Sequence, residues 1–403
     1  MRMRVLGAVV VAVALLVGLP GDAPAKERRQ FVLSPEGNHL WAYDAATDDR
    51  QLLVQAVNGS DPGVAPPARS SRRDINGQIC VSPDGRHIVT GEDTVVGGSS
   101  HDDRIAGWGW FAVGGSRLGR LWARQEGKLA PALPEGDQGY RGDPDNYGCG
   151  FLDQQRLLTT AIGNVFPGEE ANGQLFLWFG PFDTGYEEVT ADGATFFVGS
   201  VPHCEIDGAL ATAGGIAIDP SNGDVYVTTN RPDDEGNPGA VWRYRGVWPR
   251  TRAECTPEFV AANITKQQVI PGIAGAPADP RSPTPSSVVV SRHGTLFVAS
   301  VFSGTVAEYT REGEWIRDIY PVSPVTPFTG PTSDTPYGLA QTADGSLWIA
   351  DLGIVVAQPA PGAGSLIRVR FDAAGNPVLP AETVQDGLTF PDGLGVWTAP
   401  RRG

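Results

Sequence analysis

Oxygen-bearing residues stand where apolar strand pairs of this chain begin and end, and together they could hold a cation. As metal ligands we predict Glu92, Asn146, Asn164, Asn230 and Asp351. Carboxylate and amide oxygens are hard ligands, which Ca²⁺ or another divalent cation prefers. Such a cation could polarise an ester carbonyl and lower the pKa of a bound water, with Asp351, Asp392 or His203 as general base. The alternative is structural, because Asp and Asn also end strands and cap turns.

The strand pairs that carry these residues recur along the chain. Five copies read FVLSPEGNHLWAYD from Phe31, CVSPDGRHIVTGED from Cys80, GIAIDPSNGDVYVTTN from Gly215, VVVSRHGTLFVAS from Val288 and GLAQTADGSLWIAD from Gly338. A weaker copy starts at Cys149, and a single strand, PDGLGVW, starts at Pro391. Gly-bearing turns between alternating apolar residues predict hairpins. Because helical patterns are nearly absent between them, the repeat predicts an all-β fold, a closed β-propeller.

Counting the strand pairs gives the number of blades. Inner strands are expected to start near positions 32, 80, 149, 217, 289, 340 and 394, and the last has no hairpin after it. We therefore predict six blades, with the final strand pairing into the first blade to close the ring and remove two sheet edges. Seven blades are the alternative, with the additional blade within residues 93–145.

The repeat also sorts residues by face. Inner strands start, and second strands end, on one face of a propeller, which we call the loop face; the turns joining them lie on the opposite turn face. His39, His87 and His293 stand in or beside these turns and are expected on the turn face. His101 follows a second strand and His203 precedes an expected inner strand, so both are expected on the loop face, near the predicted metal ligands.

Composition limits the cellular setting. Arg2 and Arg4, the apolar run 6–19 and the small residues ending at Ala25 predict a signal peptide over 1–25, cleaved near Ala25. Residues 26–403 are expected to form one propeller domain, secreted or periplasmic and monomeric. The net charge of −15 disfavours nucleic acid as a partner, and no later segment predicts a transmembrane anchor.

Four cysteines allow two disulfides in an exported chain. Cys80 and Cys149 occupy equivalent places in consecutive repeats, so their strands are expected to be neighbours. We predict the pairs Cys80–Cys149 and Cys204–Cys255; four buried free thiols are the alternative. No CxxC pair indicates a cysteine metal site.

The segments PDGLGVW, PYGLAQTADGSLWIAD and GGIAIDPSNGDVYVTTN resemble the strand pair of NHL-repeat proteins and of the gluconolactonase and senescence-marker-protein group. Strictosidine-synthase-like and paraoxonase-like propellers are more distant. The resemblance implies a six-bladed fold with a divalent cation, often Ca²⁺, in the channel. Its amide ligands would correspond to Asn146, Asn164 or Asn230, and its late Asp to Asp351 or Asp392.

The chain departs from that group in one respect. The early Glu of the group has no match in RRQFVLSP, and Glu92 stands at the end of a second strand instead. Streptogramin-lyase-like propellers, which use a His and Mg²⁺, are similar through His203 or His101, although they have seven blades.

Two classes of function remain open. The first is an exported, metal-dependent hydrolase acting on a lactone or ester. The second is a non-catalytic scaffold that binds a protein, a glycan or cell-wall component, or a small molecule through the loop face. Long spacings between the copies at 80, 149, 217 and 289 motivate the second, because they add loop residues to three neighbouring blades. A quinone-dependent sugar dehydrogenase is a weaker alternative.

Overall fold

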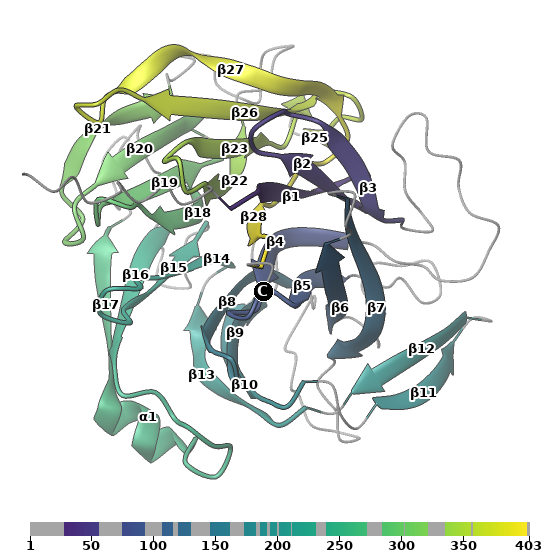
Figure 1. Ribbon diagram of the computed structural model, residues 1–403. Coiled ribbons are helices and arrows are strands. Elements are labelled where there is room, and N and C mark those ends of the chain that lie inside the picture. Colours follow the sequence, from purple (N-terminus) through teal and green to yellow (C-terminus); the bar gives the residue numbers. More distant parts are fainter. Residues whose placement is uncertain are drawn as a thin grey trace, which may run out of the picture.

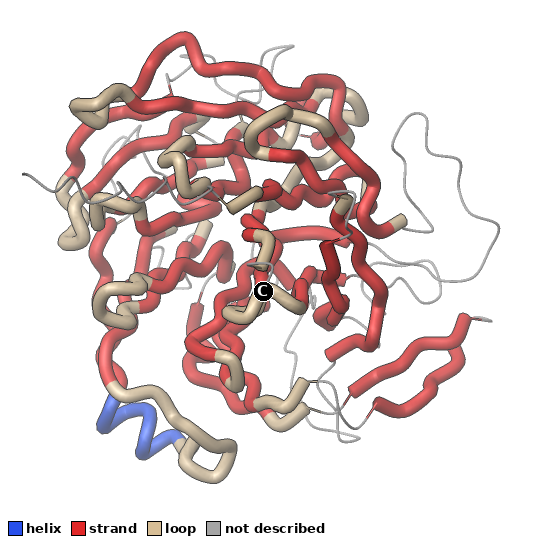
Figure 2. Tube along the Cα trace, viewed as in Figure 1, coloured by secondary structure: helices blue, strands red, loops and turns tan. Residues whose placement is uncertain are grey.

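The computed structural model shows a ring of β-sheets around a central channel (Figure 1). It describes residues 28–55, 75–92, 107–115, 120–129, 146–161, 173–182, 186–191, 194–199, 201–210, 212–230, 239–271, 284–301, 303–320, 335–355 and 358–400. Strands account for nearly all the regular structure of these residues (Figure 2). The sheets form six blades, as predicted.

Each blade has four antiparallel strands, which are named in order from the channel outward. Blade 1 contains β28 (Gly395–Thr398), β1 (Gln30–Glu36), β2 (His39–Asp44) and β3 (Arg50–Val54). Blade 2 contains β4 (Ile75–Val81), β5 (His87–Glu92), β6 (Gly107–Gly115) and β7 (Leu121–Leu129). Blade 3 contains β8 (Asn146–Asp153), β9 (Arg156–Ala161), β10 (Gly173–Phe179) and β13 (His203–Leu210).

The other three blades follow the same order. Blade 4 contains β14 (Ala213–Ile218), β15 (Val225–Thr229), β16 (Ala240–Gly246) and β17 (Ile264–Ile270). Blade 5 contains β18 (Pro285–Val290), β19 (Leu296–Ser300), β20 (Thr305–Tyr309) and β21 (Trp315–Tyr320). Blade 6 contains β22 (Pro336–Gln341), β23 (Leu347–Asp351), β26 (Gly364–Phe371) and β27 (Pro377–Leu388).

Three smaller features are added to the ring. The hairpin of β11 (Tyr186–Ala191) and β12 (Ala194–Gly199) extends blade 2, where β12 pairs in parallel with β7. The hairpin of β24 (Ile354–Val355) and β25 (Gln358–Pro359) lies between β23 and β26, on the loop face. The helix α1 (Pro257–Asn263) precedes β17, and the Thr256 side chain caps it by accepting from the Phe259 backbone N–H.

The final strand closes the ring by pairing into blade 1, as predicted, but the order of the strands in blade 1 differs from the expected one. The final strand β28 is the inner strand of blade 1, and Phe31 pairs with Trp397 in the second position. The hairpin from Phe31 therefore joins the second and third strands, so His39 lies on the loop face and not on the turn face as expected. The hydrogen bond from Ile75 N to Asn38 O, at 3.3 Å, fixes this hairpin beside the start of the next inner strand.

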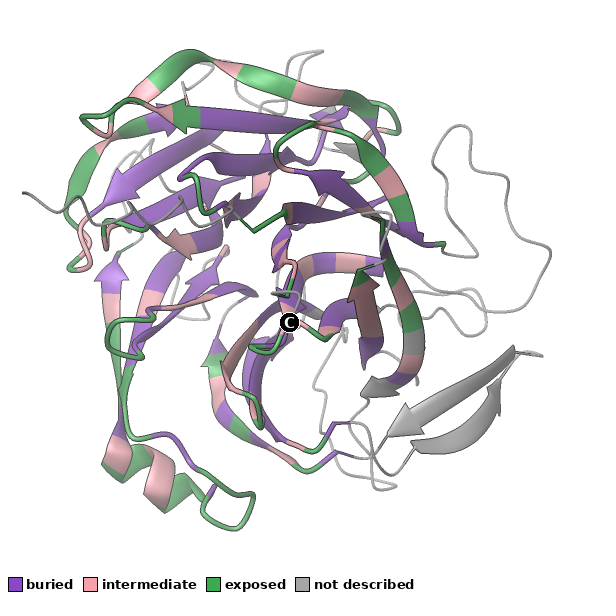
Figure 3. Cartoon of the chain, viewed as in Figure 1, coloured by how far each residue is buried: buried purple, intermediate pink, exposed green. Residues whose placement is uncertain are grey.

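The hydrophobic core lies between neighbouring blades. Trp108 of blade 2 packs in one cluster with Phe176 and Trp178 of blade 3, and both Trp side chains have 0% exposure. Burying one such side chain contributes roughly 2 to 3 kcal/mol. Exposed residues gather on the outer strands β3, β21 and β27 (Figure 3). This layered burial explains why inner strands read as near-continuous apolar runs.

Glycines allow the inner strands to converge at the loop face. A Cβ atom on Gly393 would lie 1.8 Å from Gly77 O, and one on Gly338 would lie 2.7 Å from the Cα of Gly393. On the other side of the ring, a Cβ atom on Gly148 would lie 2.2 Å from Gly214 O. Only glycine fits where two backbones approach this closely. The x-Gly-apolar pattern at the start of inner strands thus narrows the channel at one end.

Both predicted disulfides are present, and they join neighbouring blades. Cys80–Cys149 links the inner strands β4 and β8, and Cys204–Cys255 links β13 to the segment before α1. The described residues contain no free cysteine. The equivalence of Cys80 and Cys149 in consecutive repeats was therefore a valid guide to their contact.

Candidate functional site

Tyr147 lies across the loop-face end of the channel. It belongs to β8 in blade 3, and its ring meets that of Tyr337 in blade 6 edge to face, with centroids 4.9 Å apart. Its hydroxyl donates to Asp392 O at 2.8 Å, just before β28. Burial, reinforced by Tyr337 and Asp392, raises the pKa of Tyr147 well above its usual value, so the hydroxyl stays a donor. One buried side chain therefore links blade 3 to the opposite side of the ring.

The carboxylate of Asp351 is buried and engaged with the backbone around it. Its Oδ1 accepts from the Thr335 hydroxyl at 2.9 Å, from Thr335 N at 3.2 Å and from Gly353 N at 3.1 Å. The side chain is 3% exposed. Oδ1 thus fastens the segment entering blade 6 to the loop that leaves its second strand. Because this oxygen already has three donors, Asp351 acts first as a structural tie.

Strand register shows which loop-face residues are equivalent. Glu92, Ser300 and Asp351 each end a second strand opposite the first residue of the inner strand. Thr229 holds this place in blade 4, since it pairs with Ala213. Asn230, which we expected at the end of the second strand, therefore lies one residue beyond that end. Its backbone N–H donates to Thr212 O at 3.1 Å.

Of the remaining predicted ligands, the structure describes Asn146 and Asp392 but not Asn164. Asn146 starts β8 and pairs through its backbone with Ala161, and Asp392 precedes β28 with a half-buried side chain. Asn164 and His101 lie outside the described residues, as does the predicted signal peptide. In the part of the chain that the structure describes, no group of three or more His, Cys, Asp or Glu side chains could hold a metal ion. The metal site stays a prediction.

His203 is not on the loop face, and this expectation was wrong. It starts β13, the outermost strand of blade 3, where it pairs with Trp178 at the end of β10 that faces the turn side. Its ring lies 4.5 Å from that of Trp178, and Nδ1 is 3.1 Å from Val201 O. Burial lowers the pKa of His203. The residue is thus a packed side chain of an outer strand, remote from Asp351 and Asp392.

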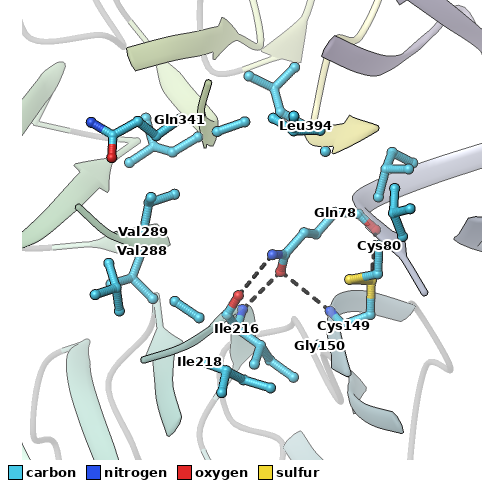
Figure 4. A pocket seen from close by; sticks show the side chains of 18 of the residues that line it. Gln78, Cys80, Cys149, Gly150, Ile216, Ile218, Val288, Val289, Gln341 and Leu394 are labelled. Carbon is cyan, nitrogen blue, oxygen red and sulfur yellow. Dashed lines mark hydrogen bonds between the residues drawn. A yellow bond between two sulfur atoms is a disulfide. The ribbon is translucent and has the colours of Figure 1, made fainter. Parts of the chain in front are cut away.

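Gln78 bridges three blades inside the channel. Its Nε2 donates to Ile216 O at 2.8 Å, and its Oε1 accepts from Ile216 N at 2.9 Å and from Cys149 N at 3.3 Å (Figure 4). The amide therefore pairs with one peptide group of blade 4 much as a backbone would. Sequence reasoning missed this residue, although a polar side chain within the inner-strand segment NGQICV was a visible signal.

Below Tyr147 the channel widens into a cavity of about 290 Å³. Inner-strand residues from all six blades line it, including Gln78, Gly150, Ile218, Val289, Gln341 and Leu394 (Figure 4). The predicted polar residues Asp351, Asp392 and Asn230 are not among the lining residues. The channel thus has a bridged, tightly packed end at the loop face and a wider, uncharged part beneath it.

Known proteins resemble this chain only distantly. No protein-family model and no curated protein matches the sequence. Among solved structures, a chain of the nidogen/laminin complex is 10% identical with a TM-score of 0.49, covering 91% of this chain and 98% of that one. Luciferin-regenerating enzyme is 8% identical with a TM-score of 0.48, covering 91% and 94%. These likenesses are too distant to assign an activity.

A third similar structure is regucalcin, a calcium-binding protein from Agrobacterium tumefaciens. It is 12% identical with a TM-score of 0.41, covering 78% of this chain and 75% of that one. The specific family suggested by the sequence resemblance therefore stays a proposal, while the six-bladed architecture follows from the sheets themselves.

Proposed function

We propose that this protein is a binding scaffold that captures a basic protein partner on its loop face, at blades 2 to 4. The observation that supports this proposal is a concentration of acidic residues. The connections 93–106, 130–145, 162–172 and 231–238 contain twelve Asp or Glu residues and three Arg residues. The described strands that flank these connections all begin or end at the loop face.

Charge complementarity explains why a basic partner fits. A concentration of one sign of charge attracts an oppositely charged surface and speeds the encounter. Long connections at one end of a rigid scaffold are also where binding residues commonly stand. Tyr147 spans the loop-face end of the channel through its contacts with Tyr337 and Asp392, so a partner bound outside the channel suits this face better than a small substrate bound within it.

The proposed setting is an oxidising compartment. Two disulfides are typical of exported proteins, and no helix among the described residues is long and apolar enough to cross a membrane. Together with the predicted signal peptide, we expect the scaffold to act after export.

Binding of a cationic polypeptide tests the proposal. Poly-L-lysine should bind the full-length protein more tightly than poly-L-glutamate, with an affinity that falls as salt rises from about 0.05 to 0.15 M. The double change Asp233→Asn and Asp234→Asn should weaken poly-L-lysine binding several-fold. The matched control, Glu312→Gln with Glu314→Gln, removes two exposed carboxylates from a turn-face connection of blade 5 and should change little. Equal effects of the two pairs would refute a loop-face site.

A metal-dependent hydrolase of lactones or esters is the second candidate. One observation favours it: Glu92 and Asp351 occupy equivalent register positions at the loop-face ends of blades 2 and 6. If a divalent cation such as Ca²⁺ binds there, turnover of a lactone panel should be lost with a chelator and restored by Ca²⁺. No turnover, with no metal in the purified protein, would exclude this candidate.

A further inference from the structure

The channel cavity is separate from the bridged loop-face end, and the described residues of its wall include no charged side chain. Its 19 lining residues come from β4, β8, β14, β18, β22 and the segment 394–396, and none is Asp, Glu, Lys, Arg or His. In the whole chain, by contrast, 19% of residues are Asp, Glu, Lys or Arg. The absence of charge at this one place distinguishes the cavity from the acidic surface of the protein.

The two polar side chains of the wall are already engaged. The Gln78 amide is hydrogen-bonded to Ile216 and Cys149, as described above. The Gln341 Oε1 accepts from Arg292 N at 2.9 Å, and its Nε2 donates to Gly345 O at 3.0 Å. The wall therefore offers a guest uncharged surface, in which backbone groups of the inner strands lie beside apolar side chains and can accept or donate hydrogen bonds.

The cavity reaches the turn face and has a preformed wall. Its lining includes Val81, Val290 and Gln341, which are the last residues of β4, β18 and β22 at that face. The first residues of these strands, at the loop-face end, are not in the lining. Cys80–Cys149 covalently joins two of the six inner strands, which limits how far the wall can relax.

We infer that this cavity binds an uncharged small molecule with an apolar chain and a polar group, which enters from the turn face. Ligand sites are commonly concavities of about 300 to 1,000 Å³, and this cavity of about 290 Å³ lies just below that range. An apolar guest would return water from the wall to bulk solvent. A charged guest would lose hydration without a counter-charge in the wall, which is strongly unfavourable.

A matched series of guests tests the inference. Ligand-observed NMR titrations would compare hexan-1-ol, hexanoate and hexylammonium, which share one chain and differ in charge, against the full-length protein. Hexan-1-ol should bind at least tenfold more tightly than either ion. Ala217→Phe, which adds volume to the wall, should weaken hexan-1-ol at least tenfold. Val378→Phe, on exposed β27 outside the cavity, is the control and should leave the affinity within twofold.

A second variant keeps the test valid if Ala217→Phe does not fold. Val396→Phe enlarges a lining residue of β28 on another side of the ring, and circular dichroism would show which variant is folded. Absence of hexan-1-ol binding, binding of either ion as tight as that of hexan-1-ol, or unchanged binding in a folded wall variant would each overturn the inference. These outcomes are independent of poly-L-lysine binding, which reports on the opposite face.

Discussion

The bridge made by Gln78 gives a quantitative test of how the ring is held together. Gln78→Met keeps the length of the side chain but removes its amide group, which takes away three hydrogen bonds to blades 3 and 4. Each bond contributes about 1 kcal/mol net, and a buried backbone group left without a partner adds to the loss. Because water in the open cavity can reach some of these groups, we expect the free energy of unfolding to fall by about 2 kcal/mol.

Urea denaturation followed by tryptophan fluorescence measures this change. The urea midpoint should move down without a change in slope, and the melting temperature should fall by about 2 to 3 °C. Gln385→Met on the outer strand β27 is the control, because the Gln385 side chain donates to its neighbour Asp386 O. A loss below about 0.5 kcal/mol for Gln78→Met, or an equal loss in the control, would refute the bridging role.

Two further predictions concern stability. Replacing Cys80 and Cys149 together by Ala should lower the free energy of unfolding by about 4 kcal/mol, because the bond closes a loop over a sequence separation of 69; an unfolding midpoint close to that of wild type would contradict this. Burial holds the pKa of His203 in the folded protein below its unfolded value of about 6.5. The unfolded chain therefore binds the proton more readily than the folded protein does. The stability that the neutral ring supplies should consequently be lost as pH falls below about 6.5. His203→Gln should remove this part of the pH dependence, and a wild-type-minus-variant difference that is constant from about pH 7.5 to 5 would show the argument to be wrong.

The sequence was a good guide wherever one repeat could be compared with another. Equivalent positions of Cys80 and Cys149 predicted a contact, and the unpaired segment at Pro391 predicted ring closure. The sequence was a poor guide where a hairpin pattern does not show which two strands of a blade it joins. The copy at Phe31 has the same turn chemistry as the others, yet it joins second and third strands because β28 occupies the inner position.

The misplacement of His203 has a related cause. The hairpin β11–β12, which extends blade 2, stands in sequence between the third and fourth strands of blade 3, so the strand at His203 was read as the approach to a new blade. The contacts of Gln78 and Tyr147 could not be predicted for a different reason. Their partners lie 138 and 245 residues away in sequence, and only the closed ring brings them together.

The inner position of β28 has a consequence for how the chain matures. Gln30 in β1 pairs with Thr398, across a sequence separation of 368. Until residues 395–398 have been synthesised, β1 has no inner partner, and blade 1 must present an open strand edge to its surroundings. Contacts this distant in sequence slow folding. The ring therefore becomes a closed molecule only after residues 395–398 have been synthesised, and until then blade 1 depends on other protection from aggregation.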